Sequence, residues 1–365
     1  MSTSVVTRSI CTAILCLPTA AGATITVKPG GPIGTIQAGV DAAAAGDKIK
    51  ITKGTYQEVV VIPAGKDGLK LLADPGTILE ARLAGGMAGG PGISISSADV
   101  SISDLTIRNA EAIMGGPSDG ILCGASGLTV KDCTFLHNAG NGVQSIDGPS
   151  VTGCLFRGNN EAIRAVGDLV VVKNCVVRDD CETGIRISGN DALIESNQIL
   201  SIEDGNGVSI NGSNAAVRKN VINNTDGSCV CISGDGAEIT DNVISRTENN
   251  GIEVSGSTID VSDNKVSNCR ALGITVSGDG VTIDHNTVTC TGASGIAGNG
   301  NDITASRNDV SECGDRGIFL DGTNPTIDDN KIAGTSSALI EVDGDNPTVT
   351  GNAVRDSIDD AVGIM

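Results

Sequence analysis

Residues 273–294 read GITVSGDGVTIDHNTVTCTGAS, and the same pattern stands on either side of them. The 22 residues before them, 251–272, read GIEVSGSTIDVSDNKVSNCRAL, and the 22 after them, 295–316, read GIAGNGNDITASRNDVSECGDR. A fixed period of this length is typical of repeat architectures, in which each unit buries its apolar side chains against its neighbours. The repeat unit therefore decides the fold.

Two landmarks keep the period along most of the chain. A Gly-apolar-x-apolar element, with a few variant first residues, returns every 20 to 23 residues, at Gly120, Gly142, Ala162, Gly184, Gly207, Cys229, Gly251, Gly273, Gly295, Gly317, Leu339 and Ala361. The second landmark has the same spacing and is a polar or small residue, at Cys133, Cys154, Cys175, Asn197, Asn220, Asn242, Asn264, Asn286, Asn308, Asn330 and Asn352. Two landmarks in one register make a chance pattern untenable.

Each unit is predicted to contain three short strands. In the quoted unit these are residues 274–277, 281–283 and 287–289, separated by a turn at 278–280 and a bend at 284–286. Alternation places some side chains in the core and others in solvent. We expect His285 to face solvent and the following side chains to face inward: Ile274, Val276, Val281, Ile283, Asn286 and Val288.

This pattern resembles the right-handed parallel β-helix proteins of the pectin-lyase-like superfamily, from about residue 24 to the end of the chain. The resemblance implies an all-β, single-stranded right-handed parallel β-helix with an inward asparagine ladder. The ladder also has a physical reason. A buried Asn must satisfy both its donor and its acceptor, and stacked Asn side chains can do so with neighbouring coils. Cysteine at the same position upstream is a small apolar alternative.

The N-terminal part is less regular. Residues 25–27, 48–51, 59–62, 69–72, 93–95 and 101–103 are predicted strands. Residues 35–45 are a predicted amphipathic helix with Thr35 as N-cap, and this helix would cover the open end of the solenoid. We therefore divide the chain into 1–23, a signal peptide; 24–119, a cap with irregular coils; and 120–365, regular coils continuous with them.

The C-terminal end shows no cap, since residues 362–365 continue a strand pattern. A partner that covers this end is one interpretation, and an early end of the chain is the other. The sequence assigns no oligomeric state. About fifteen coils spaced at about 4.8 Å would form a rod roughly 70 Å long.

The composition argues against an aromatic core, and the N-terminal segment indicates export. The 365 residues include 50 glycines but no Trp, one Tyr and three Phe. Residues 1–23 contain Arg8, an apolar run over 10–17 and the small residues AGA at 21–23, which are typical of a secretory signal peptide. The apolar run is too short to span a bilayer, so we expect no transmembrane segment. The expected location is periplasmic, cell-surface or extracellular.

The charge narrows the range of partners. The formal net charge is −20, with 24 basic and 44 acidic residues. This excess disfavours nucleic acid and anionic membranes. A polyanionic ligand would need local basic residues or bridging calcium, and no other cofactor is indicated.

The outward position of the first strand carries the candidate site. Arg164 and Arg186 fall there on neighbouring coils, with acids in the preceding loops. In the enzymes that the sequence resembles, this strand and this loop hold the substrate; acids bind calcium, and Arg or Lys neutralises a uronate or removes its C5 proton. The candidates are Arg164, Arg186 and Asp180 for catalysis; Gln144, Glu161, Asp179 and His137 for substrate binding; and Asp179, Asp180 and Glu182 for calcium. The alternative is a solvated charge cluster without activity.

Polygalacturonase activity is disfavoured by the motifs. Residues 224–227 read NTDG and match the first motif of those enzymes, but Asn249 and Asn250 stand where the next acids are expected. Residues 271–273 read ALG in place of Gly-His-Gly, and no Arg-Ile-Lys occurs. Inverting hydrolysis needs two facing carboxylates, which are not assembled. The Asp-Pro-His-Asp motif of alginate epimerases is also missing.

Three cysteines recur in the loops. Cys269, Cys290 and Cys313 fall at nearly the same position of successive coils, so a disulfide between one pair is open. Zinc is disfavoured because no histidine accompanies them and no CxxC occurs.

Two functions remain open. The first is an exported protein that binds or modifies polysaccharide, with uronate polymers as substrate of a lyase, an epimerase or a hydrolase-like enzyme. The second is a non-catalytic surface or extracellular β-helix that acts in structure or adhesion and binds glycan or partners through its flank. A periplasmic metal-handling β-helix is a third hypothesis, with little support from scattered Cys and two His.

Overall fold

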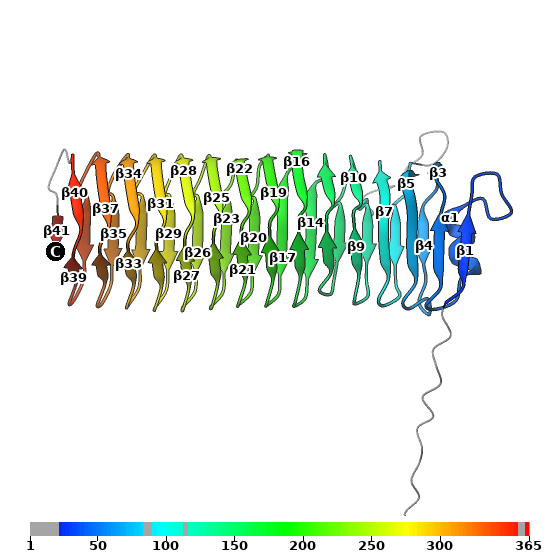
Figure 1. Ribbon diagram of the computed structural model, residues 1–365, viewed down its shortest axis with the longest axis horizontal. Helices are drawn as coiled ribbons and strands as arrows, with labels where there is room; N and C mark the ends of the chain where they lie inside the picture. The colour runs from blue at the N-terminus through cyan, green and yellow to red at the C-terminus, as the bar shows by residue number, and fades with distance from the viewer. Residues whose placement is uncertain (1–21, 83–88, 112–115, 357–361, 365) are drawn as a thin grey trace, which may run out of the picture.

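The computed structural model describes residues 22–82, 89–111, 116–356 and 362–364, and it is a single elongated solenoid (Figure 1). The chain winds from the blue N-terminal end to the red C-terminal end of a rod, and each coil adds one strand to each face. All strand pairings between coils are parallel. The predicted fold class is confirmed.

The first strand of every coil belongs to one sheet of 14 strands, here called the first-strand sheet. Its members are β4 (Val60–Ile62), β6 (Ile93–Ile95), β8 (Ile121–Cys123), β11 (Val143–Ser145), β14 (Glu161–Val166), β17 (Thr183–Ser188), β20 (Val208–Asn211), β23 (Val230–Ser233), β26 (Ile252–Ser255), β29 (Ile274–Ser277), β32 (Ile296–Asn299), β35 (Ile318–Asp321), β38 (Ile340–Asp343) and β41 (Val362–Ile364).

A 27-stranded sheet holds the other two faces as two ladders that share the long strands β5 (Lys70–Glu80) and β7 (Ser101–Arg108). The second-strand ladder also contains β1 (Thr24–Val27), β2 (Lys48–Ile51), β9 (Thr129–Lys131), β12 (Ser150–Thr152), β15 (Val171–Lys173), β18 (Leu193–Glu195), β21 (Ala216–Arg218), β24 (Glu238–Thr240), β27 (Asp260–Ser262), β30 (Thr282–Asp284), β33 (Thr304–Ser306), β36 (Thr326–Asp328) and β39 (Thr348–Thr350). The third-strand ladder also contains β3 (Thr55–Gln57), β10 (Thr134–Leu136), β13 (Leu155–Arg157), β16 (Val176–Cys181), β19 (Gln198–Ile202), β22 (Val221–Thr225), β25 (Val243–Thr247), β28 (Lys265–Cys269), β31 (Thr287–Thr291), β34 (Asp309–Cys313), β37 (Lys331–Thr335) and β40 (Ala353–Arg355).

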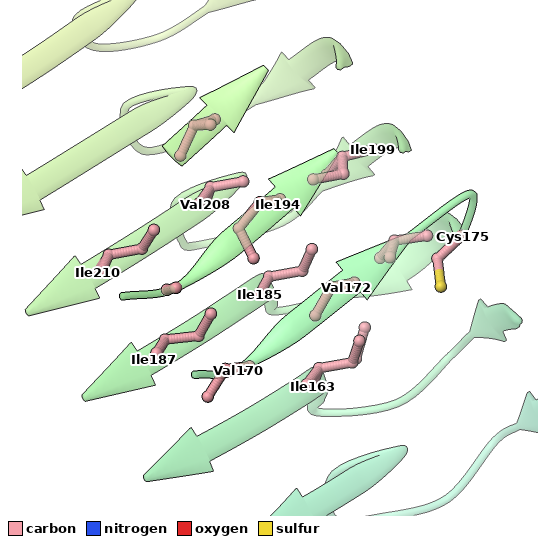
Figure 2. Packing of buried hydrophobic residues seen from close by; sticks show 14 of the residues in the cluster. Ile163, Val170, Val172, Cys175, Ile185, Ile187, Ile194, Ile199, Val208 and Ile210 are labelled. Atoms are coloured by element: carbon pink, nitrogen blue, oxygen red, sulfur yellow. The ribbon is translucent and has the colours of Figure 1, made fainter. Parts of the chain in front are cut away.

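The core is a set of aliphatic columns that run along the rod (Figure 2). Ile163, Ile185 and Val208 occupy equivalent positions of β14, β17 and β20, and all three are fully buried. β-Branched side chains suit this arrangement because they pack well on a pleated surface and have few rotamers to lose.

The asparagine ladder is present in the predicted register. The Nδ2 of Asn286 donates to the Val261 carbonyl at 2.8 Å and to Asn308 Oδ1 at 3.0 Å. Its Oδ1 accepts from the backbone N and the Nδ2 of Asn264, both at 3.0 Å. Asn286 is 1% exposed, so all its hydrogen-bonding capacity is met inside the protein. The same bonds recur from Asn197 to Asn352.

The upstream cysteines continue this ladder, as predicted. Cys133, Cys154 and Cys175 are buried, and each thiol donates to a carbonyl of the preceding coil and to one in its own coil. The ladders join where the backbone N of Cys175 donates to Asn197 Oδ1 at 2.9 Å. A second, two-rung ladder was not predicted: Asn138 Nδ2 donates to Asn159 Oδ1 at 2.9 Å, beyond the third strand.

Helix α1 (Ile36–Ala42) lies against the N-terminal strands and contacts β1, β2 and β4 (Figure 1). The predicted N-cap is confirmed, since Thr35 Oγ1 accepts from the Ala38 N–H. The Glu58 carboxylate accepts from the two preceding donors, the N–H groups of Ile36 and Gln37, which the sequence did not reveal. The helix ends three residues earlier than predicted.

The N-terminal segment and the last strand of the chain were both the subject of predictions. The signal peptide predicted for residues 1–23 lies almost wholly outside the described residues, which begin at residue 22. At the other end, β41 pairs with β38 as the predicted terminal strand, and Val349 and Val354 of the last complete coil are only partly buried. A partner that covers this end stays a prediction. Across the described ranges, no helix has the length and apolar character needed to cross a membrane.

Candidate functional site

Gln144, Arg164 and Arg186 stand side by side on the outward face of the first-strand sheet. They are register partners on β11, β14 and β17, between Leu122 and Ser209. Both arginine side chains are exposed, and Gln144 is half-buried. The predicted neighbourhood of the two arginines is therefore present, at a coil spacing of about 4.8 Å.

A column of polar residues lies at the N-terminal ends of β8, β11, β14 and β17. This entry column consists of Asp119, Asn141, Glu161 and Thr183, one from each of four successive coils. All four are buried, with Asp119 at 3% exposure and Asn141 and Glu161 at 7%. Buried polar side chains need hydrogen-bond partners, so the contacts of this column reveal what it can do.

Arg186 is held by the entry column. Its Nε donates to Glu161 Oε1 at 2.8 Å, and its Nη2 donates to Thr183 Oγ1 at 3.3 Å. In contrast, Arg164 makes no ion pair with any described residue. The guanidinium of Arg186 is fixed by these contacts, whereas no hydrogen bond or ion pair with a described residue fixes that of Arg164.

Asn141 connects Asp119 with the outward face. The Nδ2 of Asn141 donates to Asp119 Oδ1 and to Gln144 Oε1, each at 2.8 Å, and its backbone N also donates to Asp119 Oδ1. Within the described part of the chain, Asn141 Oδ1 and Glu161 Oε2 are buried without a hydrogen-bond partner. Two buried acceptors without a partner among the described residues therefore lie beside the exposed guanidinium of Arg164.

Asp119 has the perturbed acidity of a buried carboxyl group. Burial raises the pKa of Asp119, against the hydrogen bonds from Asn141 and the attraction of Arg164, which lower it. Removal of charged groups from water disfavours the ionised form, and this is the dominant cause here. Such perturbed groups are frequent at functional sites, although structural networks also produce them.

Two of the remaining candidate residues, Asp179 and His137, lie apart from the arginine pair. Asp179 is on the outer side of the third-strand ladder, where its Oδ2 is 3.1 Å from Arg157 Nε and 3.8 Å from Arg178 Nε. His137 occupies the same corner position two coils earlier and is exposed, as is Glu182 in the loop before β17. The structure thus separates Asp179 and His137 from the outward face of the first-strand sheet.

The calcium prediction involves Asp179, Asp180 and Glu182. Asp180 lies on β16, but its side chain is outside the part of the chain that the structure describes. Among described residues, no group of three or more His, Cys, Asp or Glu side chains is gathered as a metal site requires. Calcium at this loop stays a prediction.

His285 is on the surface, as its register predicted. Its side chain is 51% exposed, and its Nδ1 lies 2.7 Å from Asp284 Oδ2. Arg307 forms a bidentate pair with the same carboxylate, at 2.9 and 2.6 Å. Burial alone would raise the pKa of Asp284, but the hydrogen bonds from Arg307, Ser306 and His285 lower it to about 2.

The disulfide left open for Cys269, Cys290 and Cys313 is not formed. Cys269 and Cys313 are buried, two coils apart, with Thr291 between them in the strand register. Cys290 is one residue off this column and is exposed. A shift of one residue turns the side chain to the other face, so equal loop positions did not mean equal directions.

A hollow on the surface of the third-strand ladder was missed by the sequence reasoning. It has a volume of about 740 Å³ and lies at the corner after the third strands β22 to β34. The available signal was a position that repeats every 22 residues, one residue before Thr225 in the first coil. It is polar in four of the five coils and is held by Asn224, Arg246, Asn268, Cys290 and Glu312. The NTDG motif at residues 224–227 contributes Asn224, Thr225 and Asp226 to its wall.

Comparison with known proteins identifies the family. The model of the right handed beta helix region matches residues 162–297 and 228–365, together more than half of the chain. Comparison with curated proteins finds no match.

Two solved structures illustrate the likeness. The periplasmic alginate epimerase AlgG is 13% identical over 83% of this chain and 77% of its own, with a TM-score of 0.51. Tailspike protein 3 of bacteriophage CBA120 is 11% identical over 88% of this chain and 57% of its own, also with a TM-score of 0.51. At these identities the likeness concerns the fold alone. Because the family model covers more than half of its length, the chain belongs to the right-handed β-helix family.

Proposed function

We propose that this protein binds an acidic, uronate-containing polysaccharide along the outward face of the first-strand sheet, at β11, β14 and β17. The observation that carries the proposal is the free guanidinium of Arg164 between Gln144 and the fixed Arg186. A planar guanidinium recognises a carboxylate through two parallel hydrogen bonds. In a chain of net charge −20, such a cation is needed locally before a polyanion can approach.

The neighbouring groups suit the rest of a sugar ring. Gln144 and the fixed Arg186 offer donors on either side of Arg164. The spacing of the coils, about 4.8 Å, presents these groups in a row along the rod. A linear polymer laid across the coils can therefore meet several of them at once. An alginate epimerase of the same fold supports polysaccharide as the ligand class.

We further propose that the protein modifies the bound polymer by a lyase or epimerase reaction. In a lyase reaction a base removes the C5 proton, the bond between C4 and the glycosidic oxygen breaks, a C4–C5 double bond forms, and the leaving oxygen takes a proton. In an epimerase reaction a proton returns to C5 from the other side. Arg164 and Arg186 are proposed to neutralise the uronate carboxylate, which lowers the cost of the carbanion-like transition state, with Asp180 as the proton acceptor.

One observation favours binding without catalysis. The arginine pair lies on regular strands, and both arginine side chains are exposed on the outward face. Catalytic sites usually enclose the reacting part of the substrate and exclude water. A surface or adhesion β-helix that holds glycan on an open flank has no such need, so it is the second candidate function.

The test combines binding with turnover. Polygalacturonate, alginate and neutral dextran are titrated against the protein with and without calcium, and unsaturated products are followed by ultraviolet absorbance and new reducing ends. We expect Arg164→Gln to weaken binding of the acidic polymers about 10- to 100-fold, the equivalent of a charge-assisted hydrogen bond of about 1.5–3 kcal/mol. The matched control is Lys219→Asn, which removes an exposed positive charge at another bend. Binding without any turnover selects the non-catalytic candidate. Equal affinity of Arg164→Gln and wild-type protein would refute the site.

A further inference from the structure

The hollow at the third-strand corner, here called the corner hollow, crosses five coils. It extends along the rod from β22 to β34, and most of its lining residues have polar or charged side chains. Its walls are formed by Asn224, Thr225, Asp226, Arg246, Thr247, Glu248, Asn268, Cys269, Arg270, Cys290, Thr291, Gly292 and Glu312. It begins one coil beyond the coil of Arg186 (β17, β18 and β19), whose equivalent corner residue is Ser201, so it is separate from the arginine pair.

One residue per coil sets the direction of the side chains in this hollow. Asn224, Arg246, Asn268, Cys290 and Glu312 all have φ between 54° and 62°, the left-handed conformation. Because five successive coils repeat one conformation in register, these side chains leave the backbone in parallel, about 4.8 Å apart. The corner therefore presents an ordered row of polar groups.

The row contains one free cation between two free amides. Arg246 is exposed and makes no ion pair with a described residue, and no described residue hydrogen-bonds the side chains of its neighbours Asn224 and Asn268. The other charges in the hollow are engaged: Arg270 Nη1 donates to Glu248 Oε2, and the Cys290 thiol donates to Glu312 Oε2 at 2.8 Å. Only the centre of the row is left with unused donors.

We propose that the corner hollow binds a uronate ring, with its carboxylate on Arg246 and its hydroxyls on the flanking groups. The guanidinium supplies two parallel donors to the carboxylate, and the amides of Asn224 and Asn268 can donate to it or to the ring hydroxyls. Asp226 and Glu312, at the edges, accept hydroxyl protons in charge-assisted hydrogen bonds. The inference rests on the proposed function for its ligand class, an acidic saccharide, but the binding site is a different one.

Other ligand classes fit this lining less well. A neutral sugar is usually held by an aromatic platform, and this wall has no aromatic residue. A polyphosphate needs several cations in a row, whereas here one free arginine stands among three carboxylates. A ligand with one negative charge and several hydroxyl donors matches both the free donors and the surrounding acceptors.

The native cysteines allow each face to be followed separately. Cys290 is exposed in the corner hollow, and Cys231 is half-buried on the outward face of the first-strand sheet, between Ser209 and Glu253. The full chain is incubated with galacturonate trisaccharide, or with maltotriose as the neutral control, and alkylation of each cysteine by iodoacetamide is timed by mass spectrometry. We expect the acidic trisaccharide to slow alkylation of Cys290 at least fivefold at saturation, and maltotriose to have no effect.

Matched variants identify the groups responsible. Arg246→Asn introduces the residue that the neighbouring coils carry at this left-handed position, so the fold should be kept; Lys219→Asn makes the same change at another left-handed bend, with φ 57°. We expect Arg246→Asn to abolish the protection of Cys290, and Lys219→Asn to retain it. Circular dichroism verifies that both variants are folded.

The outcomes separate the two proposals. If Arg164→Gln removes trisaccharide binding while Arg246→Asn leaves both affinity and Cys290 alkylation unchanged, the corner hollow is refuted and the proposed function stands. If Arg246→Asn removes protection while Arg164→Gln has no effect, the inference stands and the site on the first-strand sheet falls. If the trisaccharide protects no cysteine and does not bind, both proposals are overturned.

Discussion

Replacing Asn286 by alanine should destabilise its coil far more than any exposed substitution there. The change removes the donor to the Val261 carbonyl and the acceptor of two hydrogen bonds from Asn264. These partners are buried, so water cannot replace the lost bonds. An unsatisfied buried donor or acceptor costs about 1–3 kcal/mol, so two or three of them should cost about 3–5 kcal/mol.

Two further variants calibrate this value. Asn286→Cys introduces the residue found at Cys133, Cys154 and Cys175, whose thiols donate to the preceding coil. It should recover the bond to the carbonyl but not the two accepted bonds, so its cost should be about half. Asn352→Ala removes the last rung, which is half-buried, and should cost about 1 kcal/mol because water can reach its partners.

The assay must report on one coil, because solenoid stability is a sum of local and nearest-neighbour contributions. Native-state hydrogen exchange of the Asn264 amide, which donates to Asn286 Oδ1, is the direct readout, and urea unfolding gives the overall loss. Asn286→Ala should speed this exchange strongly, and Asn352→Ala should leave it unchanged. A loss below about 1 kcal/mol for Asn286→Ala, with Asn264 still protected, would refute the reasoning about unsatisfied groups.

Three other predictions concern acidity, reactivity and backbone contact. The pKa of Asp284 is lowered from 3.8 to about 2, so its ion pairs stabilise the fold above about pH 4 and are lost as the pH falls toward 2. Over that interval, urea titrations should show that the wild-type protein loses about 1–2 kcal/mol more of its free energy of unfolding than Asp284→Asn does. The hydrogen bond to Glu312 raises the pKa of the Cys290 thiol, so Glu312→Gln should increase the thiolate fraction and speed alkylation near neutral pH; an unchanged rate counts against that hydrogen bond. A Cβ on Gly278 would lie 1.9 Å from the Gly256 carbonyl oxygen, whereas one on Gly280 would meet nothing within 4 Å. Gly278→Ala should therefore lower the melting temperature markedly. Gly280→Ala should lower it only slightly, because a non-glycine residue in the left-handed conformation costs roughly 1 kcal/mol of the free energy of unfolding. Equal effects of the two substitutions would show that the Gly256 carbonyl moves aside.

The N-terminal cap of helix α1 was predictable where the capping residue is close in the sequence, and it was missed where the capping residue is distant. Thr35 stands three residues before its hydrogen-bonding partner Ala38, so the cap could be read from the sequence. Glu58 caps the same helix from 22 residues away, and nothing in the helix sequence points to it. Similarly, β5 and β7 are longer than the predicted strands 69–72 and 101–103, because each continues into the next face of the solenoid.

The candidate site shows the same limit. The outward register of Gln144, Arg164 and Arg186 follows from alternation and the repeat period, so the sequence placed them together correctly. The ion pair of Arg186 with Glu161 depends on how a bend directs the Glu161 side chain toward the next coil. The pairing of Asp179 with Arg157 likewise depends on the corner of the coil, which a residue count does not reveal.

The sequence by itself determined the solenoid, its 22-residue coil, the inward columns and the asparagine ladder. These follow from period and alternation, because every coil stacks in register and repeats the environment of the one before. Only the tertiary structure decided which charged side chains pair, which of Cys269, Cys290 and Cys313 is exposed, and where the corner hollow lies. Those features depend on side-chain directions at bends, where one residue more or less turns a side chain from the core to solvent.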